Sequence, residues 1–261
     1  MTTTGVPTIR VVEGVASLDG LDFFSGDLDE LKERVGALLS SGGVHLIVTT
    51  NTDQIIDFGK SKGLSEAYNL ASLRLVDGKP LQSLVRALGG RNTERITGAD
   101  LLPQAADWSR EEKWRIAIIG GSDYVGEGAA RNLRTLYPGS HVEHIPFPHT
   151  NNVKNENSGI VREQLHYYRP DISFVCLGSP KQEEWVVENM DNLPDGIYVG
   201  AGAAVDFAAG AKSRAPLLMQ RMGLEWTWRL VQEPRRLWRR YLVKGSAFFF
   251  VIIKSMWGKL K

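Results

Sequence analysis

Cysteine is almost missing from this 261-residue chain, in which Cys176 is the only one. A single cysteine excludes an intrachain disulfide, argues against a structural zinc site and fits a reducing compartment. Long apolar runs are missing too, because the longest, residues 247–253, is far shorter than the roughly 20 residues that span a bilayer. Residues 1–14 lack the basic start and apolar stretch of a signal peptide. We therefore expect a cytoplasmic protein that does not cross a membrane.

Several signature motifs of enzymes are also absent. The chain has neither the G-x-G-x-x-G fingerprint of dinucleotide-binding proteins nor a P-loop lysine, and its five histidines show no H-E-x-x-H spacing. Asp27 and Asp29 match the D-x-D pair with which many sugar transferases hold a divalent ion. They lie at the start of a predicted helix, however, where acidic residues interact favourably with the helix dipole. We therefore predict no metal site and no cofactor.

The charges that are present are unevenly distributed. Residues 214–261 contain eleven Lys or Arg and two acidic residues, which leaves twenty basic and twenty-eight acidic residues before them. Such a split indicates an anionic partner for the basic end. Nucleic acid, a phosphorylated ligand and an anionic membrane surface all satisfy this requirement.

Short apolar, β-branched runs alternate with helical patterns, which predicts an α/β fold with a Rossmann-like, mostly parallel sheet and helices on both faces. The expected strands are 44–49, 73–76, 115–119, 141–145, 172–177 and 197–199. The expected helices are 28–40, 52–60, 64–69, 81–88, 99–106, 126–136, 157–168 and 181–189, and residues 146–156 are expected to form a loop. After residue 210 the sequence becomes helical, aromatic and basic. We therefore divide the chain into a core, 1–210, and a helical appendage, 211–261, docked at the ligand edge of the sheet.

Ligands of open α/β sheets bind beyond the carboxyl ends of the strands, so polar residues just after a strand are candidates for the site. Asp77 follows the run LRLV and precedes Gly78, which lets the backbone turn sharply. Its carboxylate fits a general base at the sheet edge. Capping of the helix that begins near Pro80 is an equally weighted alternative.

Three glycine-containing turns follow other predicted strands. Gly120 and Gly121 precede a helix whose backbone amides are suited to an anion or ribose, although a simple strand-to-helix turn fits equally well. In LGSPKQEEW, a glycine-proline turn is expected to expose three residues that read a base or a diphosphate, unless it is only a charged helix start. Those three residues are Lys181, Gln182 and Glu183. Gly178 and Gly202 belong to the same set of strand ends.

The motifs TTNTDQI, LVDGKPL, ERITGADLL, IIGGSD, LGSPKQEEW and RAPLLMQRMGLEWTWRLVQEPRR, in this order, resemble the WecG/TagA/CpsF family of bacterial glycosyltransferases over residues 44–242. The resemblance implies an inverting enzyme of the hexosyltransferase or N-acetylmannosaminyltransferase type that works without a metal. Its donor would be a UDP-sugar. Its acceptor would be a polyprenyl-diphosphate-linked glycan or another membrane glycolipid in cell-surface polysaccharide or teichoic acid biosynthesis.

The matching motifs also imply roles for individual residues. Asp77 takes the place of the catalytic base. Four further positions of the active site fall on Thr49, Asn51, Arg95 and Gln182. The appendage arginines that help to close the site and meet the diphosphate or the membrane fall on Arg229, Arg236 and Arg239, and we add Arg214 to this set. The family often has an aliphatic residue in place of Lys79, so the choice of donor or acceptor can differ here.

These inferences lead to an expected cellular setting. We expect the protein to lie on the inner face of the bacterial plasma membrane, with the basic appendage on anionic lipid and residues 248–253 and Trp257 in the interface. Packing of this tail against another subunit is the alternative, which leaves a homo-oligomer open. Nucleic acid is not expected as a partner. The alternative functions are a nucleotide-cofactor oxidoreductase and a basic, non-enzymatic RNA-binding protein.

Overall fold

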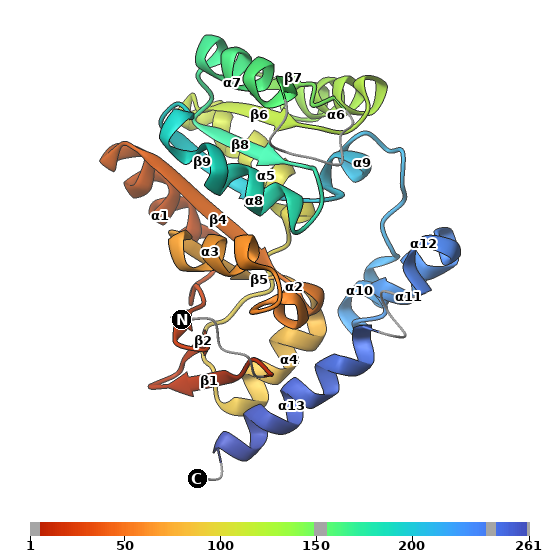
Figure 1. Cartoon of the computed structure of the whole chain (residues 1–261). Helices are drawn as coiled ribbons and strands as arrows, with labels where there is room; N and C mark the ends of the chain where they lie inside the picture. The colour runs from red at the N-terminus through yellow and green to blue at the C-terminus, as the bar shows by residue number, and fades with distance from the viewer. Residues whose placement is uncertain (1–5, 149–155, 239–243, 260–261) are drawn as a thin grey trace.

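A six-stranded, wholly parallel sheet forms the centre of the computed structural model, which describes residues 6–148, 156–238 and 244–259 (Figure 1). The strand order is β5-β4-β9-β8-β6-β7. The strands are β4 (Val44–Thr50), β5 (Leu73–Val76), β6 (Arg115–Ile119), β7 (His141–Ile145), β8 (Ile172–Val175) and β9 (Gly196–Gly200). The predicted fold class is confirmed, and all six predicted strands are present.

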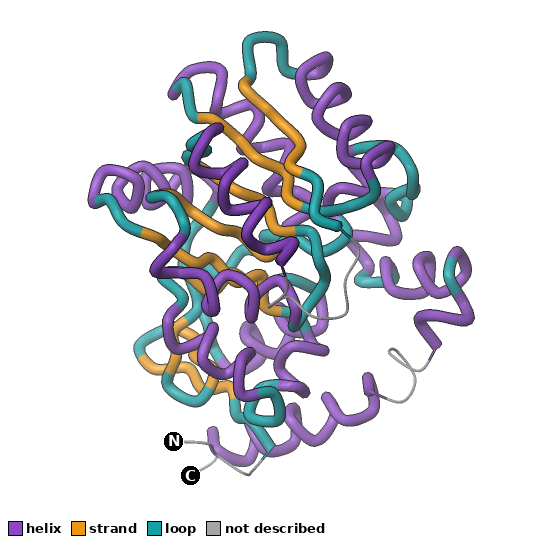
Figure 2. Tube along the Cα trace, turned by 45° about the horizontal axis from the view of Figure 1, so that its top comes forward, coloured by secondary structure: helices purple, strands orange, loops and turns teal. Residues whose placement is uncertain are grey.

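Helices cover both faces of this sheet (Figure 2). Successive residues of a strand point to opposite faces, so Leu46 and Val48 belong to one apolar cluster and Ile47 to the other. The first face carries α2 (Thr52–Asp57), α3 (Lys62–Leu70), α4 (Lys79–Leu88), α7 (Glu156–Tyr168) and α8 (Lys181–Asn189), which the short 3-10 helix η1 (Met190–Asn192) follows. The second face carries α1 (Leu28–Ser41), α5 (Gly98–Glu112), α6 (Asp123–Leu136) and α9 (Ala204–Ala208). Double coverage explains why inner strands such as β6 and β8 are mostly apolar.

A small antiparallel sheet precedes the main one, and the sequence analysis missed it. It consists of β1 (Ile9–Val12), β2 (Val15–Leu18) and β3 (Leu21–Asp22). The strands are short, and the β1–β2 turn places Glu13 and Gly14 at positive φ angles of 53° and 89°. Ile9 and Leu18 are fully buried in the same apolar cluster as α4. This small sheet therefore extends the first face of the core.

Among its described residues, the appendage contains four helices, α10 (Leu217–Met222), α11 (Glu225–Gln232), α12 (Pro234–Trp238) and α13 (Gly245–Lys259). The last of them runs past α2 and α4 to the small sheet, where Ser255 Oγ accepts a hydrogen bond of 2.9 Å from the amide of Ile9 (Figure 1). Phe248 and Val251 are buried in the core. The division of the chain at residue 210 stays a proposal, because α13 shares the core of the preceding residues.

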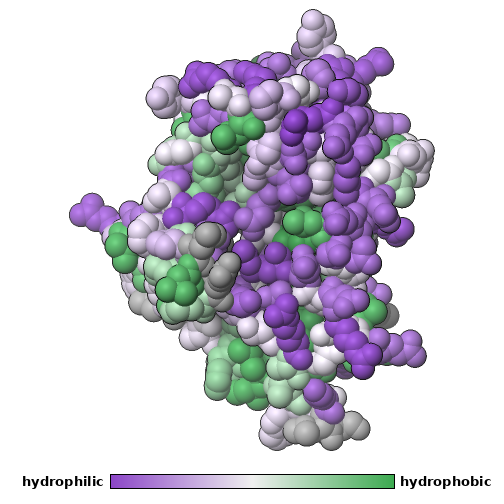
Figure 3. Space-filling model, turned by 180° about the vertical axis from the view of Figure 1, so that it is seen from behind, coloured by the Kyte–Doolittle hydropathy of each residue, from purple (hydrophilic) through white to green (hydrophobic). Residues whose placement is uncertain are grey.

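The inward orientation of Phe248 and Val251 corrects part of our expectation for the appendage. We expected the whole run 248–253 to enter a membrane interface, but α13 buries every third or fourth of its side chains against the core. The apolar side chains of α13 that remain exposed are Phe249, Phe250, Ile253, Met256 and Trp257. Seen from behind, the surface is mostly hydrophilic, and hydrophobic side chains gather over the appendage and at the lower end of the molecule (Figure 3).

Within the described parts of the chain, none of the helices combines the length and the apolar character that crossing a membrane requires.

Asp27 and Asp29 lie at the start of α1, as the sequence indicated. An Asp27 carboxylate oxygen accepts hydrogen bonds of 2.9 Å from the amides of Asp29 and Glu30, and Glu30 Oε2 accepts one of 2.9 Å from the amide of Asp27. This reciprocal arrangement is a capping box. Asp27 therefore has a structural role at the helix start.

We predict that Asp27→Ala lowers the free energy of unfolding by about 1 kcal/mol, the usual cost of a lost N-cap. Urea unfolding measures this change. Asp27→Asn is the matched control, because asparagine also accepts the capping hydrogen bonds, and it should stay close to the unsubstituted protein. Unchanged stability in Asp27→Ala would contradict the capping role.

Candidate active site

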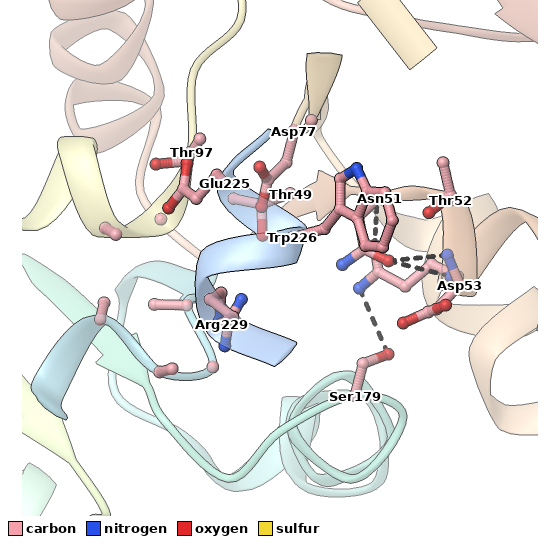
Figure 4. Close-up of a pocket in the computed structure, with 18 of the residues that line it drawn as sticks. Thr49, Asn51, Thr52, Asp53, Asp77, Thr97, Ser179, Glu225, Trp226 and Arg229 are labelled. Atoms are coloured by element: carbon pink, nitrogen blue, oxygen red, sulfur yellow. Dashed lines mark hydrogen bonds between the residues drawn. The ribbon is translucent and has the colours of Figure 1, made fainter. Parts of the chain in front are cut away.

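The carboxyl ends of β4, β5, β8 and β9 meet at one edge of the sheet and open into a cavity of about 1110 Å³. Helix α11 of the appendage contributes the opposite wall. Figure 4 shows Asp77, Thr49 and Asn51 near one another, with Trp226 of α11 beside Asn51 and Arg229 on the other side of the same helix. The cavity thus brings together residues that are far apart in the sequence.

Asp77 lies at the end of β5, where the sheet stops. Its backbone amide donates a hydrogen bond of 2.7 Å to Thr50 O, which continues the pairing with β4. Gly78, at φ 101°, then turns the chain into α4 and is itself the N-cap, without a side-chain cap. The alternative that Asp77 caps this helix is therefore wrong. Its carboxylate lines the cavity instead.

The surroundings of Asp77 raise its affinity for a proton. Burial raises the pKa of this carboxyl group from 3.8 to about 7, Arg95 and Arg229 lower it, and the carboxylates of Glu225 and Asp100 raise it. A carboxyl group with a pKa near neutrality is partly ionised at physiological pH. It therefore accepts a proton more strongly than an ordinary aspartate does.

Thr49 and Asn51 fix the loop beside Asp77. Thr49 Oγ1 donates a hydrogen bond of 2.6 Å to Gly200 O, which ties the end of β4 to the end of β9. Asn51 is the N-cap of α2, and its Oδ1 accepts hydrogen bonds from the amides of Asp53 at 3.0 Å and Gln54 at 3.1 Å. Both residues line the cavity while they determine the shape of its wall.

Gln182 joins two glycine turns below the cavity. Its Oε1 accepts hydrogen bonds from the amides of Gly178 at 3.1 Å and Gly202 at 2.9 Å. The two glycines adopt φ angles of 78° and 54°, which glycine tolerates best. All three residues line the cavity. The predicted exposure of Gln182 is wrong, because 3% of the residue is exposed and its amide is engaged with the backbone.

Glu183 corrects the prediction further. It is fully buried, and its Oε1 accepts hydrogen bonds from Gln182 Nε2 at 2.7 Å and Gln54 Nε2 at 2.8 Å. Burial raises the pKa of Glu183, which favours its neutral form. Neither Glu183 nor Lys181 is among the described residues that line the cavity. Glu183 therefore supports the wall from within, because it orients the side-chain amides of both glutamines.

Gly120 and Gly121 are likewise outside the set of described residues that line the cavity. A Cβ atom on Gly120 would lie 2.9 Å from Leu177 Cδ2, and one on Gly121 would lie 3.3 Å from Val205 Cγ2. Ser122 then caps α6. Close packing at a strand-to-helix turn accounts for both glycines, as the alternative interpretation held.

Two arginines beside the cavity share two carboxylates. The Asp100 carboxylate accepts a hydrogen bond of 3.4 Å from Arg95 Nη2 and one of 2.7 Å from Arg214 Nη1. Glu225 lies 4.0 Å from Arg95 Nη1 and 3.4 Å from Arg214 Nε. Arg229 lies 5.7 Å above the ring of Phe207 and lines the cavity, as Arg95 does. Arg239 lies outside the described residues, and so does the side chain of Arg236.

Sequence reasoning missed several residues of the site, among them Glu225, Trp226 and Lys244 of the appendage. Glu225 and Trp226 lie one helical turn from Arg229, a spacing that the motif GLEWTWRL contains. Lys244 lines the cavity at the start of α13 and pairs with Asp57 at 2.6 Å. The signal for these residues was the predicted proximity of the appendage to the sheet edge.

No group of three or more His, Cys, Asp or Glu residues with the geometry to hold a metal ion occurs in the described parts of the chain.

Comparisons with known proteins identify the family to which this chain belongs. The model of the Glycosyl transferase WecG/TagA/CpsF family matches residues 16–261. An N-acetylglucosaminyldiphosphoundecaprenol N-acetyl-beta-D-mannosaminyltransferase of Staphylococcus aureus strain MRSA252 is 25% identical over 258 residues, which cover 97% of this chain and 98% of the relative. The protein of the same name from strain MW2 is 24% identical over the same shares of both chains. The resemblance is confirmed, and the chain belongs to the WecG/TagA/CpsF family of glycosyl transferases.

Proposed function

We propose that this glycosyl transferase moves a sugar, with inversion, from a UDP-sugar to a polyprenyl-diphosphate-linked glycan. The names of the relatives indicate N-acetylmannosamine as the sugar and N-acetylglucosaminyl diphosphoundecaprenol as the acceptor. UDP-glucose, UDP-galactose and the uronic acid of UDP-N-acetylmannosamine are the other candidate donors. Those names also specify a β-linked product, which inversion gives from an α-linked nucleotide sugar.

The observation that carries this proposal is the carboxylate of Asp77 in the cavity wall, with a raised pKa and without a capping role. In a single displacement, the acceptor hydroxyl oxygen attacks the anomeric carbon while Asp77 takes the hydroxyl proton. The bond from the anomeric carbon to the diphosphate oxygen breaks, and its electron pair leaves with UDP. Arg95 and Arg229 line the same cavity and stabilise the negative charge of the departing diphosphate.

We also propose that the appendage brings the enzyme to the inner face of the plasma membrane. Exposed apolar side chains on α13, among them Phe250 and Trp257, stand beside Lys254 and Lys259. Such a mixture favours the interface of an anionic membrane, where the lipid-linked acceptor is found. Packing of the same surface against a second copy of the chain remains the alternative.

The family match favours the transferase over the two other functions that the sequence left open. Separate titrations with UDP and with NAD distinguish the two enzymes, because a transferase should bind UDP and an oxidoreductase should bind NAD. Steeply salt-dependent RNA binding without release of UDP would support the RNA-binding protein.

We predict that Asp77→Asn lowers turnover by about 10²- to 10⁴-fold, the usual contribution of a general base, and keeps UDP binding. Release of UDP from UDP-N-acetylmannosamine in the presence of the lipid acceptor measures turnover, and calorimetry measures binding. Asp57→Asn is the matched control, because it removes another cavity-lining carboxylate, which pairs with Lys244. This control should keep most of its turnover. Unchanged turnover in Asp77→Asn would contradict the assignment of the base.

The raised pKa of Asp77 predicts the pH dependence of the reaction. The ionised carboxylate is the active form, so kcat/KM should fall about tenfold per unit as the pH drops below about 7. Initial rates between pH 5 and 9 provide this profile. Rates that stay constant down to pH 5 would show that the proton acceptor has an ordinary carboxyl pKa.

If arginines neutralise the diphosphate, removal of divalent ions should leave the rate unchanged. We predict equal turnover with excess EDTA and with added Mg²⁺ or Mn²⁺, measured on the same protein sample. A rate that disappears with EDTA and returns with the metal would refute the proposed metal independence.

A further inference from the structure

Glu225 of α11 places a carboxylate between Arg95 of the core and Arg214 of the segment that leads into the appendage helices. Its Oε2 lies 4.0 Å from Arg95 Nη1, and its Oε1 lies 3.4 Å from Arg214 Nε. Both separations exceed the usual length of a charge-assisted hydrogen bond, which is about 2.7–2.9 Å. Arg214 Nε is buried and has no hydrogen-bond partner within the described structure. The carboxylate therefore balances charge here without a tight bond to either guanidinium group.

The arginines do not need Glu225 to keep their positions. Asp100 pairs with Arg214 at 2.7 Å and with Arg95 at 3.4 Å. Asp100 is itself fixed, because Thr97 Oγ1 donates to its Oδ2 at 2.8 Å and its own amide donates to Thr97 Oγ1 at 3.0 Å. A rigid carboxylate of the core thus neutralises one of the two positive charges. Glu225, which comes from the appendage, neutralises the other.

Glu225 contacts Arg214 and lines the cavity, so we infer that its side chain covers Arg214 on the cavity side. The described residues that line the cavity include Arg95 and Glu225 but not Arg214. If the Glu225 side chain rotates away, Arg214 becomes part of the wall. The cavity would then present two adjacent guanidinium groups, with only one carboxylate behind them.

Two adjacent guanidinium groups match a diphosphate better than they match a carboxylate. Each phosphate presents several anionic oxygens to the planar fork of an arginine, and a diphosphate carries at least two negative charges. We propose that Glu225 is a resident counter-ion that the diphosphate of the donor displaces from Arg95 and Arg214. This inference rests on the proposed use of a UDP-sugar, and it assigns to Glu225 a positioning role that opposes donor binding.

A docking role is the competing explanation for Glu225. The other end of α11 is attached to the core through an ion pair of Glu233 with Lys212 at 3.3 Å, and Lys212 also pairs with Asp206 at 2.8 Å. If Glu225 served only to attach α11, its loss would loosen the helix that carries Arg229. UDP would then bind more weakly. The two explanations therefore predict opposite changes in affinity.

Calorimetric titration of the full chain with UDP separates them. We expect Glu225→Gln to tighten UDP binding about three- to tenfold, because the competing carboxylate is gone and each such ion pair accounts for up to a few-fold in Kd. Glu233→Gln is the matched control, since it removes one negative charge from the same helix without uncovering the arginine pair. Because Glu233 also attaches α11, the Kd of this control for UDP should be unchanged or higher, and only loss of the competing carboxylate should lower the Kd below the unsubstituted value. Uridine, which has no phosphate, should bind all three proteins equally.

Each other outcome has a definite meaning. Binding of UDP by Glu225→Gln that is equal to or weaker than that by the unsubstituted protein contradicts the exchange and leaves the proposed function intact. Absence of UDP binding to the unsubstituted protein contradicts the proposed donor. Inorganic pyrophosphate then tests the exchange alone, because it must bind Glu225→Gln more tightly than the control. Glu225→Ala, with thermal unfolding as the check of folding, should show the same direction of change.

Discussion

Burial of the Asp77 carboxylate in the cavity wall is the physical constraint on which this site depends. Removing water from a carboxylate is unfavourable, and here it raises the pKa to about 7. The protein tolerates this cost because Arg95 and Arg229 lie close enough to oppose it. The same two arginines line the cavity that would hold a diphosphate. One pair of arginines can therefore keep the buried base ionised and stabilise the leaving group.

The rigidity of this arrangement comes from buried polar groups beneath the cavity. One oxygen of Glu183 accepts from both Gln54 and Gln182, and each glutamine accepts from backbone amides at the ends of the strands. A glutamine amide that is held at its nitrogen cannot rotate, so its oxygen keeps facing the same donors. The shape of the cavity wall is thus determined by side chains that do not need to touch a ligand.

Much of the core followed from local patterns, whereas the site depended on contacts between distant segments. The strands at 73–76, 115–119 and 141–145 were predicted to the residue, and apolar runs followed by polar or glycine residues mark the first two in the sequence. The hairpin at residues 9–22 was missed, since its strands are short and gain their burial from α4 and α13. The placement of Asp77 in the sheet edge was predictable from the strand and the glycine that follows. The pairing of Glu225 with Arg95 was not, because only tertiary structure brings the appendage to the cavity.

The most direct test of this account is the ionisation of Asp77 itself. Carbon NMR of protein labelled at the aspartate carboxyl groups reports each titration, and Asp77→Asn identifies the resonance that belongs to this residue. The account predicts a midpoint near pH 7 in the free enzyme. A midpoint near 4, as in an ordinary exposed aspartate, would contradict it.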